Sequence, residues 1–323
     1  MYSTESRQLN RAARCSPRGT YFFSPCIARA NPPFGIDWKR ERTEVEAEAK
    51  KGYDGRFGPG LPAISDGQML FMLNGVKKLK EGSGRMAIIQ NGSSLFTGDA
   101  ESGPSNIRRY VIEEDLVDAI IQLPPDLFYN TGISTFVWVL TKGKEMHRAG
   151  QVQLIDASRC FVKRWKNIGN KRVDLDDNCI RLILKAYETF DNGLFEENGL
   201  VVESKVYDNA FFGYTKVTIE TALCDETGIP VLKKGKLQPI KGASDSEVIP
   251  LHENIDEYIE KNVRPYNSAA YPDRSKDKVG YEIPFTRLFY KFKPLTPSAD
   301  IFEAIKGLEV KETELMKELF GNV

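Results

Sequence analysis

The sequence predicts an α/β protein with a largely parallel sheet, because segments of strand and helix character alternate through its middle part. A helix is indicated after Asp66, which is a good N-cap, since apolar residues then recur at helical spacing until Gly82. A second helix is predicted from Ser105, as its cap, through Glu114. Short apolar runs predict strands at Met86–Gln90, Leu116–Leu123, Thr135–Thr141 and Gln151–Asp156. The alternation is typical of parallel strands, whereas the loop 124–134 holds no helix and leaves antiparallel pairing open for the strands it joins.

The flanking segments are assigned by composition. Charged or amphipathic helices are predicted at Lys39–Lys51, Asp174–Phe190 and Asn254–Asn262. Loops or linkers are predicted at Gly52–Pro62, Asn91–Pro104 and Lys233–Ser246, and Lys163–Lys171 is basic. Near the end, an apolar seam interrupted by Glu312 suits a helix that packs against another helix; it consists of Ile301, Ile305, Leu308, Leu315 and Leu319.

The composition bounds the class of protein. The 323 residues carry 45 Lys and Arg against 45 Asp and Glu, so any nucleic-acid contact must come from a local patch or from a partner subunit. The five cysteines form no CxxC pair and there are only two histidines, so we expect no metal site and predict reduced thiols in a cytoplasmic protein. No apolar run is long enough to span a bilayer, so no membrane is expected as a partner.

Residues 1–30 have a different composition from the rest. They contain five arginines and a single acid, Glu5. An Arg-rich, acid-poor start is typical of an organelle transit peptide, and a disordered or artificial leader is the alternative that we favour.

The motif Asn31-Pro32-Pro33-Phe34 has the residue types that methylation of an exocyclic amine needs. Such an amine is conjugated with its ring, so two acceptors for its hydrogens would favour a tetrahedral nitrogen with an exposed lone pair. The Asn31 side-chain carbonyl and the Pro32 backbone carbonyl can be those acceptors, and the prolines hold them in place beforehand. Phe34 offers a face on which an extruded base can stack. The structural alternative is a simple proline turn.

Long blocks after Asn31 decide between these interpretations, because they resemble the modification (methyltransferase) subunits of type I restriction-modification systems, in the N6-adenine DNA methylase family. The matching blocks are NPPFGIDWK (31–39), GRFGPGLPAISDGQMLF (55–71), RMAIIQNGSSLFTGDAESGPSNIRRYVIE (85–113), LPPDLFYNTGISTFVWVLTKGK (123–144), QLIDAS (153–158), GNKR (169–172), ESKVYDNAFFGYTKVTIE (203–220) and KVGYEIPFTRLFYKF (278–292).

The resemblance implies a role for individual residues. Asn31, Pro32, Pro33 and Phe34 match the catalytic motif of amino-methyltransferases. Phe128 matches a position where the wider family places an aromatic ring beside the flipped base, although Tyr129 is adjacent and core packing is the alternative. Asp66 and Gly67 match a segment that follows the catalytic loop.

The resemblance also implies an architecture. It is a partial Rossmann-like class I methyltransferase sheet, the C-terminal half, followed by an α+β C-terminal region. We accordingly divide the chain into a leader (1–30), the C-terminal half of the catalytic domain (31–160), a family-specific extension (161–250) and a C-terminal region with a helix for subunit contacts (251–323).

The implied function is transfer of a methyl group from S-adenosyl-L-methionine to adenine N6 in DNA, alongside a specificity (S) subunit and a restriction (R) subunit. In this family the cofactor-binding lobe precedes the catalytic motif, but the residues before Asn31 contain only Gly19 as a glycine and do not resemble the family's strand into that motif. We therefore assign no cofactor-binding residues, expect an N-terminally truncated chain or a leader from a wrong start or frame, and expect the chain alone to be inactive. The alternatives are a non-catalytic remnant that binds the specificity subunit, and a methyltransferase of this motif acting on protein glutamine or RNA.

Overall fold

The computed structural model describes residues 26–225, 230–233, 235–292 and 295–321. The chain forms two compact units, Met1–Phe285 and Thr286–Val323. Most of the predicted leader, residues 1–25, lies outside the described residues.

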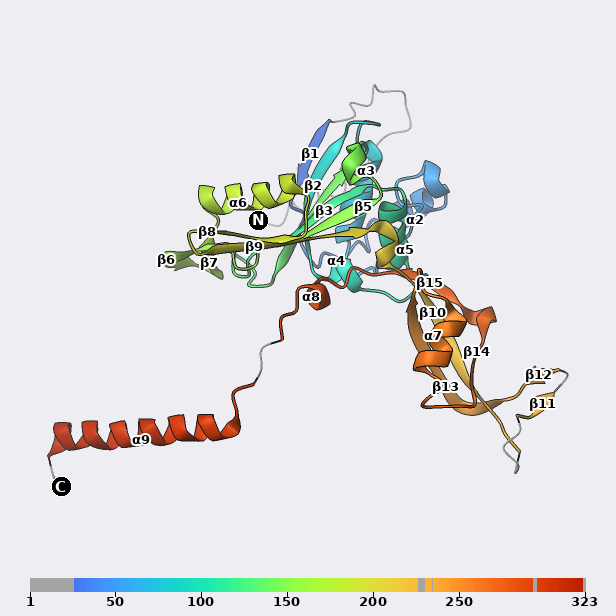
Figure 1. The fold of residues 1–323 in the computed structure, drawn as a ribbon. Helices are drawn as coiled ribbons and strands as arrows, with labels where there is room; N and C mark the ends of the chain where they lie inside the picture. The colour runs from blue at the N-terminus through green and yellow to red at the C-terminus, as the bar shows by residue number, and fades with distance from the viewer. Residues whose placement is uncertain (1–25, 226–229, 234, 293–294, 322–323) are drawn as a thin grey trace. The chain divides into compact units, whose positions relative to one another are not determined.

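The larger unit is built on a seven-stranded sheet with the order β1-β2-β4-β3-β5-β9-β8 (Figure 1). Its strands are β1 (Ile27–Ala30), β2 (Arg85–Asn91), β3 (Val117–Gln122), β4 (Thr135–Thr141), β5 (Gln151–Asp156), β8 (Gly193–Glu197) and β9 (Leu200–Asp208). β1 pairs with β2 in parallel, and β3 pairs with β5 in parallel. β4 lies antiparallel between β2 and β3, and β9 lies antiparallel between β5 and β8. The fold is therefore a Rossmann-like α/β fold in which β1, β2, β3, β5 and β8 share one direction.

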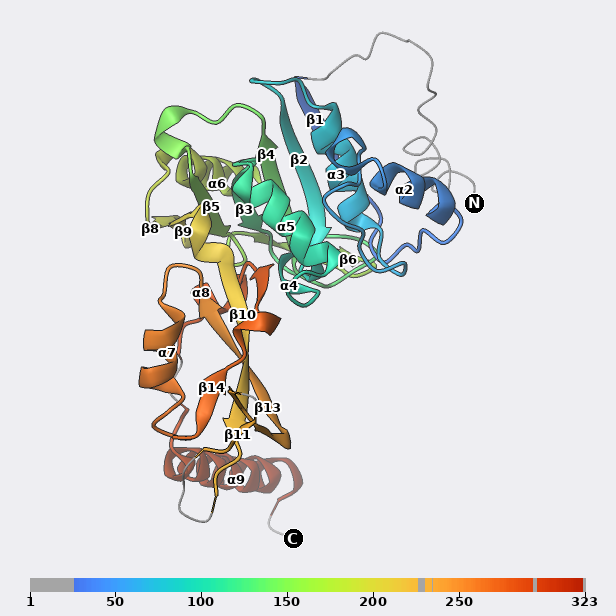
Figure 2. The ribbon, with the colours of Figure 1, turned by 90° about the vertical axis from the view of Figure 1, so that its right-hand side faces the viewer.

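Helices cover the two faces of this sheet (Figures 1 and 2). One face carries α3 (Gln68–Lys78) and α5 (Gly103–Glu113), and α2 (Arg42–Ala49), η1 (Gly52–Asp54) and α4 (Ser93–Phe96) come from the same part of the chain. On this face Gly75 of α3 is so close to β2 that an added Cβ would meet the Met86 sulfur at 2.3 Å. The other face carries α6 (Asp177–Thr189), whose Leu182 packs in one core cluster with Ile121 and Ile155. The apolar core thus forms two layers, one on each face.

A second, antiparallel sheet follows in the same unit. Its strands are β10 (Gly213–Ala222), β13 (Pro239–Pro250), β14 (Ala270–Pro272) and β15 (Lys278–Tyr281), and α7 (Ile255–Asn262) packs on it through Ile259. The small elements nearby are η2 (Met146–Arg148), η3 (Asn209–Phe212), η4 (Arg274–Lys276), and the pair β11 (Leu232–Lys233) and β12 (Lys236–Leu237). The buried Arg108 of α5 donates to the carbonyl of Tyr281 at 2.6 Å, so the second sheet is tied to the first.

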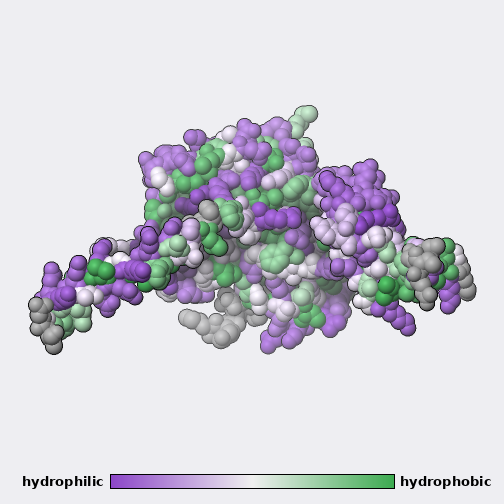
Figure 3. All heavy atoms as spheres, turned by 60° about the horizontal axis from the view of Figure 1, so that its bottom comes forward, coloured by the Kyte–Doolittle hydropathy of each residue, from purple (hydrophilic) through white to green (hydrophobic). Residues whose placement is uncertain are grey.

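A small hairpin and the smaller unit complete the described chain. β6 (Val162–Ile168) and β7 (Lys171–Asp174) form an antiparallel hairpin at the left of the seven-stranded sheet in Figure 1. The smaller unit holds α9 (Ser298–Phe320), preceded by α8 (Phe285–Leu288) at the boundary. Every described residue of α9 is exposed, and apolar side chains interrupt its hydrophilic surface in Figure 3. No helix in the described ranges is long and apolar enough to cross a membrane.

The predicted elements are largely confirmed in the first sheet. The bounds of β4 and β5 are those predicted, the strands joined by loop 124–134 are antiparallel, and α7 begins after Asn254 as its N-cap. The prediction of a leader through residue 30 is wrong for Ile27–Ala30, which form β1 and lead into the Asn-Pro-Pro motif. The division at residue 160 stays a prediction, although β8 and β9 beyond it extend the first sheet.

Four local predictions are corrected. The loop Asn91–Pro104 contains α4, and the linker Lys233–Ser246 is largely the strand β13. α5 begins at Gly103 after Ser102, and Ser105 is instead buried, its hydroxyl accepting from the Tyr281 backbone N–H at 3.0 Å. Gly67 is the N-cap of α3, while the Asp66 carboxylate, one residue earlier, accepts from the Gln68 N–H at 3.2 Å.

Candidate functional site

The candidate site lies at the carboxyl edge of the co-directional strands. β1, β2, β3 and β5 end there, followed by Asn31, Gly92, Leu123 and Ala157. In open α/β sheets ligands bind outside the carboxyl ends of the strands, where the loops diverge. Every residue predicted for catalysis or stacking comes from a loop at this edge.

The Asn31–Phe34 motif follows β1 directly. Pro32 is buried, Pro33 and Phe34 are half-buried, and Asn31 is exposed. The Asn31 side chain has no hydrogen-bond partner within the described part of the chain, so its amide is open to a ligand. Gly35 then turns the chain with φ of +63°, a left-handed conformation that favours glycine.

The chain that leaves this turn is fastened to the start of α3. The Ile36 carbonyl accepts from the Gly67 N–H at 3.0 Å. The Trp38 N–H donates to the Ile64 carbonyl at 3.0 Å, and the indole of Trp38, only 2% exposed, donates to the Ala63 carbonyl at 3.0 Å. These bonds on both sides of a buried indole hold the motif in a fixed position between β1 and α3.

A polar group at the same edge, the carboxyl-edge cluster, consists of Asp66, Gln68, Asn91 and Ser93. The amide nitrogen of Gln68, a residue that is 1% exposed, lies 2.7 Å from each of Asp66 Oδ2, Asn91 Oδ1 and Ser93 Oγ, and these three oxygens share its two hydrogens. The Gln68 side-chain carbonyl accepts from the Asn91 N–H at 3.0 Å. The cluster therefore ties the end of β2 to the start of α3 and, through Gly67, to the motif loop.

Two buried oxygens beside this cluster lack partners among the described residues. They are Gln90 Oε1 and Thr135 Oγ1, both on side chains that are 0% exposed. Sequence reasoning missed the cluster and both oxygens. The available signal was the polar run QNGSS directly after a buried strand, where strand ends and ligand sites coincide.

The loop 124–134 places its two aromatic residues differently. Phe128 is half-buried and packs against the core cluster beneath α6. Tyr129 is 55% exposed, and the Lys171 ammonium lies 5.2 Å from the centroid of its ring. β3 lies three strand positions from β1, about 14 Å at about 4.8 Å per step, so a ligand that touches both Phe34 and Phe128 must lie across β2 and β4.

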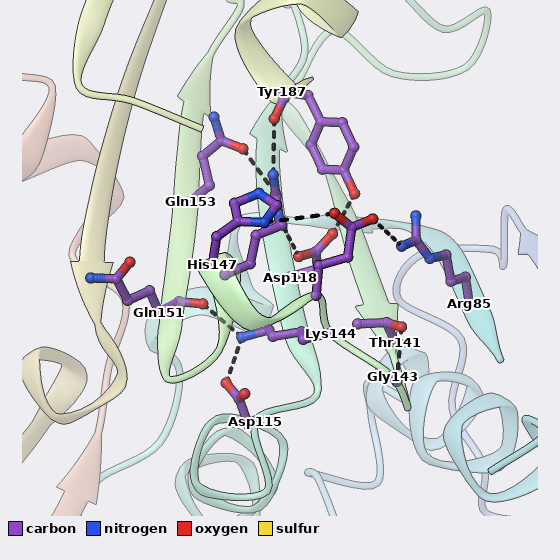
Figure 4. Close-up of polar contacts among 12 residues, drawn as sticks. Arg85, Asp115, Asp118, Thr141, Gly143, Lys144, His147, Gln151, Gln153 and Tyr187 are labelled. Atoms are coloured by element: carbon purple, nitrogen blue, oxygen red, sulfur yellow. Dashed lines mark hydrogen bonds and ion pairs between the residues drawn. The ribbon is translucent and has the colours of Figure 1, made fainter. Parts of the chain in front are cut away.

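A second polar region lies at the opposite, amino edge, where Figure 4 shows Asp118, Tyr187 and Gln153 close together. A cavity of about 410 Å³ opens there, lined by Tyr110, Lys142 and Lys144 among others. Lys144 donates to Asp115 Oδ1 and to the Gln151 carbonyl, both at 2.6 Å, and burial lowers its pKa despite the nearby carboxylate. Because no predicted site residue lies at this edge, we do not include the cavity in the candidate site. Among the described residues, no group of three or more His, Cys, Asp and Glu side chains is placed to hold a metal ion.

The strand order and the loops at the carboxyl edge define a Rossmann-like α/β protein with an Asn-Pro-Pro-Phe motif after its edge strand β1. The family model described as N-6 DNA Methylase matches residues 26–216, which is more than half of the chain. The chain therefore belongs to the N-6 DNA methylase family.

The chain is similar to parts of several known proteins. The type I restriction enzyme MjaVII methylase subunit of Methanocaldococcus jannaschii is 30% identical over 172 residues, covering 50% of this chain and 27% of that protein. The MjaIX methylase subunit of the same organism is 26% identical over 235 residues, covering 72% and 38%. The type I methyltransferase subunit from Streptococcus thermophilus aligns in structure with a TM-score of 0.48 and 28% identity, covering 60% of this chain and 36% of that one. The chain thus spans well under half the length of these relatives.

Proposed function

We propose that this chain is part of the modification subunit of a type I restriction-modification system, which transfers a methyl group from S-adenosyl-L-methionine to adenine N6 in DNA. Membership of the N-6 DNA methylase family supports the reaction class. The observation that carries the proposal is the exposed Asn31 amide at the carboxyl end of β1, which has no hydrogen-bond partner among the residues that the structure describes and is followed by a buried proline.

In this proposal the chain's own residues prepare the acceptor amine. The Asn31 side-chain carbonyl and the Pro32 backbone carbonyl accept the two hydrogens of the amine, which directs its lone pair away from the ring plane. The extruded adenine stacks on Phe34, with an interaction worth about 1–3 kcal/mol. Phe128 is the proposed second stacking residue, and its packing against the core would give it a fixed position.

S-adenosyl-L-methionine would supply the electrophilic methyl group. The described residues do not by themselves make a site for it. β1 is the outermost strand of the described sheet and Ile27 is 75% exposed, so described residues surround the motif on one side only. The polar groups of the carboxyl-edge cluster are also largely bonded to one another. We therefore assign no residue to cofactor binding, and propose that the 323-residue chain alone neither binds the cofactor tightly nor methylates DNA.

The test has two arms. Calorimetric titration of the chain alone with S-adenosyl-L-methionine should show no tight binding. Transfer of labelled methyl groups to duplex DNA should appear when the N-terminal lobe of a type I methylase subunit is supplied as a separate chain. In that mixture Asn31→Ala should lower the rate by about 10²-fold or more, because the substitution removes a preorganised acceptor for the reacting amine. Asn262→Ala, at an exposed position in α7, is the matched control. Equal rates for both variants would overturn the proposed role of Asn31.

One observation favours a second, non-catalytic role. Each apolar side chain of the α9 seam is exposed, from Ile301 at 48% to Leu319 at 74%. A helix with such a seam is suited to packing against a helix of another chain, and the specificity subunit is the proposed partner, with the restriction subunit joining the complex. Capture of a purified specificity subunit by the chain, abolished in Leu308→Asp but kept in Lys311→Asp, would support this role. Capture without any methyl transfer in the assay above would favour a binding remnant over an enzyme.

A further inference from the structure

The hairpin of β6 and β7 concentrates positive charge in a chain whose formal net charge is zero. Between Val162 and Asp174 lie five Lys and Arg residues and one acid, whereas the whole chain balances 45 basic against 45 acidic residues. We call this segment, Val162–Asp174, the basic hairpin. A local patch of this kind is what a neutral protein needs for contact with a polyanion.

Only two of these charges are used within the hairpin. Arg164 and Lys171 both pair with the Asp174 carboxylate, Lys171 at 2.8 Å. Lys163, Lys166 and Arg172 are exposed and have no ion-pair partner within the part of the chain that the structure describes. Three cations are therefore available to a ligand.

An irregular register in β6 exposes a large aromatic side chain among these cations. Lys163 pairs with Val173 and Ile168 with Lys171, so the four residues between Lys163 and Ile168 face one residue of β7. Bulges of this kind redirect side chains and recur near active sites. Trp165, within the bulge, is 103% exposed, so its indole adds no buried area to the fold.

The basic hairpin is joined to the loop 124–134 at the carboxyl edge of the sheet. The Asp126 carbonyl accepts from the Arg172 N–H at 2.9 Å, and the Tyr129 carbonyl accepts from the Asn170 N–H at 3.0 Å. Gly169, with φ of +58°, lies so close that an added Cβ would be 2.7 Å from the Tyr129 carbonyl oxygen. The hairpin thus has a defined position beside the loop that carries Phe128.

We propose that the basic hairpin binds the DNA backbone next to the candidate site, with Lys163, Lys166 and Arg172 on phosphates and Trp165 stacked on an unpaired base. The inference rests on the proposed function for the identity of the polyanion. Cations interleaved with an exposed aromatic ring suit a nucleic-acid strand, because phosphates and base faces alternate along it. An acidic protein surface would use the cations but would leave the indole without a stacking partner.

The chain offers an internal probe of this interaction. Of its three tryptophans, Trp38 and Trp138 are 2% and 0% exposed, so Trp165 alone should be accessible to a dissolved quencher. Addition of a DNA duplex with one unpaired adenine should shield this indole from acrylamide. In fluorescence anisotropy with the same labelled duplex, Trp165→Ala should weaken binding about 5- to 150-fold, the range measured for removal of base stacking.

The charges are tested by salt dependence. The variant K163A/K166A/R172A should lower the slope of log K against log salt concentration by about 3, roughly one for each phosphate that is no longer neutralised. The control K80A/K185A removes two exposed lysines outside the hairpin and should leave the slope unchanged. Circular dichroism and thermal melting verify that each variant is folded.

Three results would overturn the proposal: an unchanged slope in the triple variant, unchanged acrylamide access to Trp165 on addition of DNA, or displacement of DNA by polyglutamate of equal charge with the indole still accessible. Absence of salt-dependent DNA binding by the unaltered chain would overturn it as well. Asn31→Ala should retain the slope. If no methyl transfer appears but the hairpin variants bind DNA more weakly, the proposed function fails and the proposed role of the hairpin stands. If methyl transfer appears but the hairpin variants bind DNA as the unaltered chain does, the role of the hairpin fails and the proposed function stands.

Discussion

Replacing Asp118 with asparagine should destabilise the larger unit, because Asp118 balances the buried charge of Arg148. The side chains of Asp118 and Arg148 are 3% and 6% exposed, and Arg148 Nε lies 2.7 Å from Asp118 Oδ1. Arg148 also donates to the Tyr187 carbonyl at 3.0 Å and to Gln153 Oε1 at 3.1 Å, so it links η2, β3, β5 and α6. The Tyr187 hydroxyl donates to the second Asp118 oxygen. Burial first, and this hydrogen bond second, raise the pKa of Tyr187 to about 12, so the phenol keeps its proton at neutral pH.

The magnitude follows from what the substitution leaves behind. An asparagine keeps an acceptor for Arg148 but removes the compensating charge, and breaking a buried pair in this way costs about 3–5 kcal/mol. The Arg148 guanidinium stays 4.4 Å from the Tyr187 ring centroid and 4.0 Å from that of Phe190, and these interactions, worth about 0.5–2 kcal/mol each, survive. We therefore expect a loss near the lower limit of that range, about 3 kcal/mol.

Urea denaturation at pH 7 measures this loss. Glu260→Gln, which breaks the exposed pair with Arg264, is the control and should change the free energy of unfolding by at most about 1 kcal/mol. The double variant D118L/R148M should lose less than the sum of D118L and R148M, since it leaves no unpaired charge. A loss below about 1 kcal/mol for Asp118→Asn, or strict additivity in the double variant, would refute the account of this pair.

Three further outcomes are expected. Hydrogen bonds, chiefly from Lys51, lower the Glu48 pKa to about 2 from its ordinary 4.5, so its stabilisation is present above about pH 4.5 and disappears as the pH falls toward 2. Glu48→Gln should lower the free energy of unfolding at pH 7 by about 1 kcal/mol, a value discounted for the partial exposure of Glu48. Near pH 2 the variant and the unaltered chain should be equally stable in urea titrations, and a difference in stability that is the same at both pH values would contradict this. Gln68→Leu should cost about 2–4 kcal/mol in thermal unfolding, because it orphans partners on β2 and α4; an unchanged melting temperature would be inconsistent with the carboxyl-edge cluster. Arg108→Met removes the hydrogen-bond donor of three carbonyls and should lower the free energy of unfolding, measured by denaturation, by about 3 kcal/mol or more. An unchanged free energy would mean that water replaces the guanidinium.

The sequence predicts the elements that bury a clear apolar set. β4 is a short apolar run with no exposed residue, and α3 repeats buried apolar residues at helical spacing. β13 fails this criterion, since only Ile249 near its end is fully buried and its other residues are mostly exposed. It is a strand because its backbone pairs with β10, and such long-range pairing leaves no local signal. β1 is likewise too short to predict, and its parallel pairing with β2 makes it a strand.

The candidate site divides in the same way. The Asn31–Phe34 motif can be recognised from the sequence because its chemistry is contained in four consecutive residues. The carboxyl-edge cluster cannot be recognised in this way, because Asp66 and Asn91 come close together only when α3 packs on β2. Ser105 shows how local rules mislead: a serine before a helical segment suggests a cap, yet its hydroxyl accepts from Tyr281, far along the sequence.

The zero net charge of the chain and the proposed DNA binding are compatible for a physical reason. At physiological salt, charges beyond about 8 Å are screened, so a polyanion responds to the local patch rather than to the total. The basic hairpin is such a patch, and its backbone bonds to Asp126 and Tyr129 place it beside the loop that carries Phe128. A DNA strand bound by the basic hairpin would therefore lie at the same edge of the sheet at which Asn31 is exposed. In the mixture with the separately supplied N-terminal lobe, removal of the hairpin cations should raise the DNA concentration needed for half-maximal methylation while the rate at saturation is kept, whereas Asn31→Ala should lower the rate at saturation.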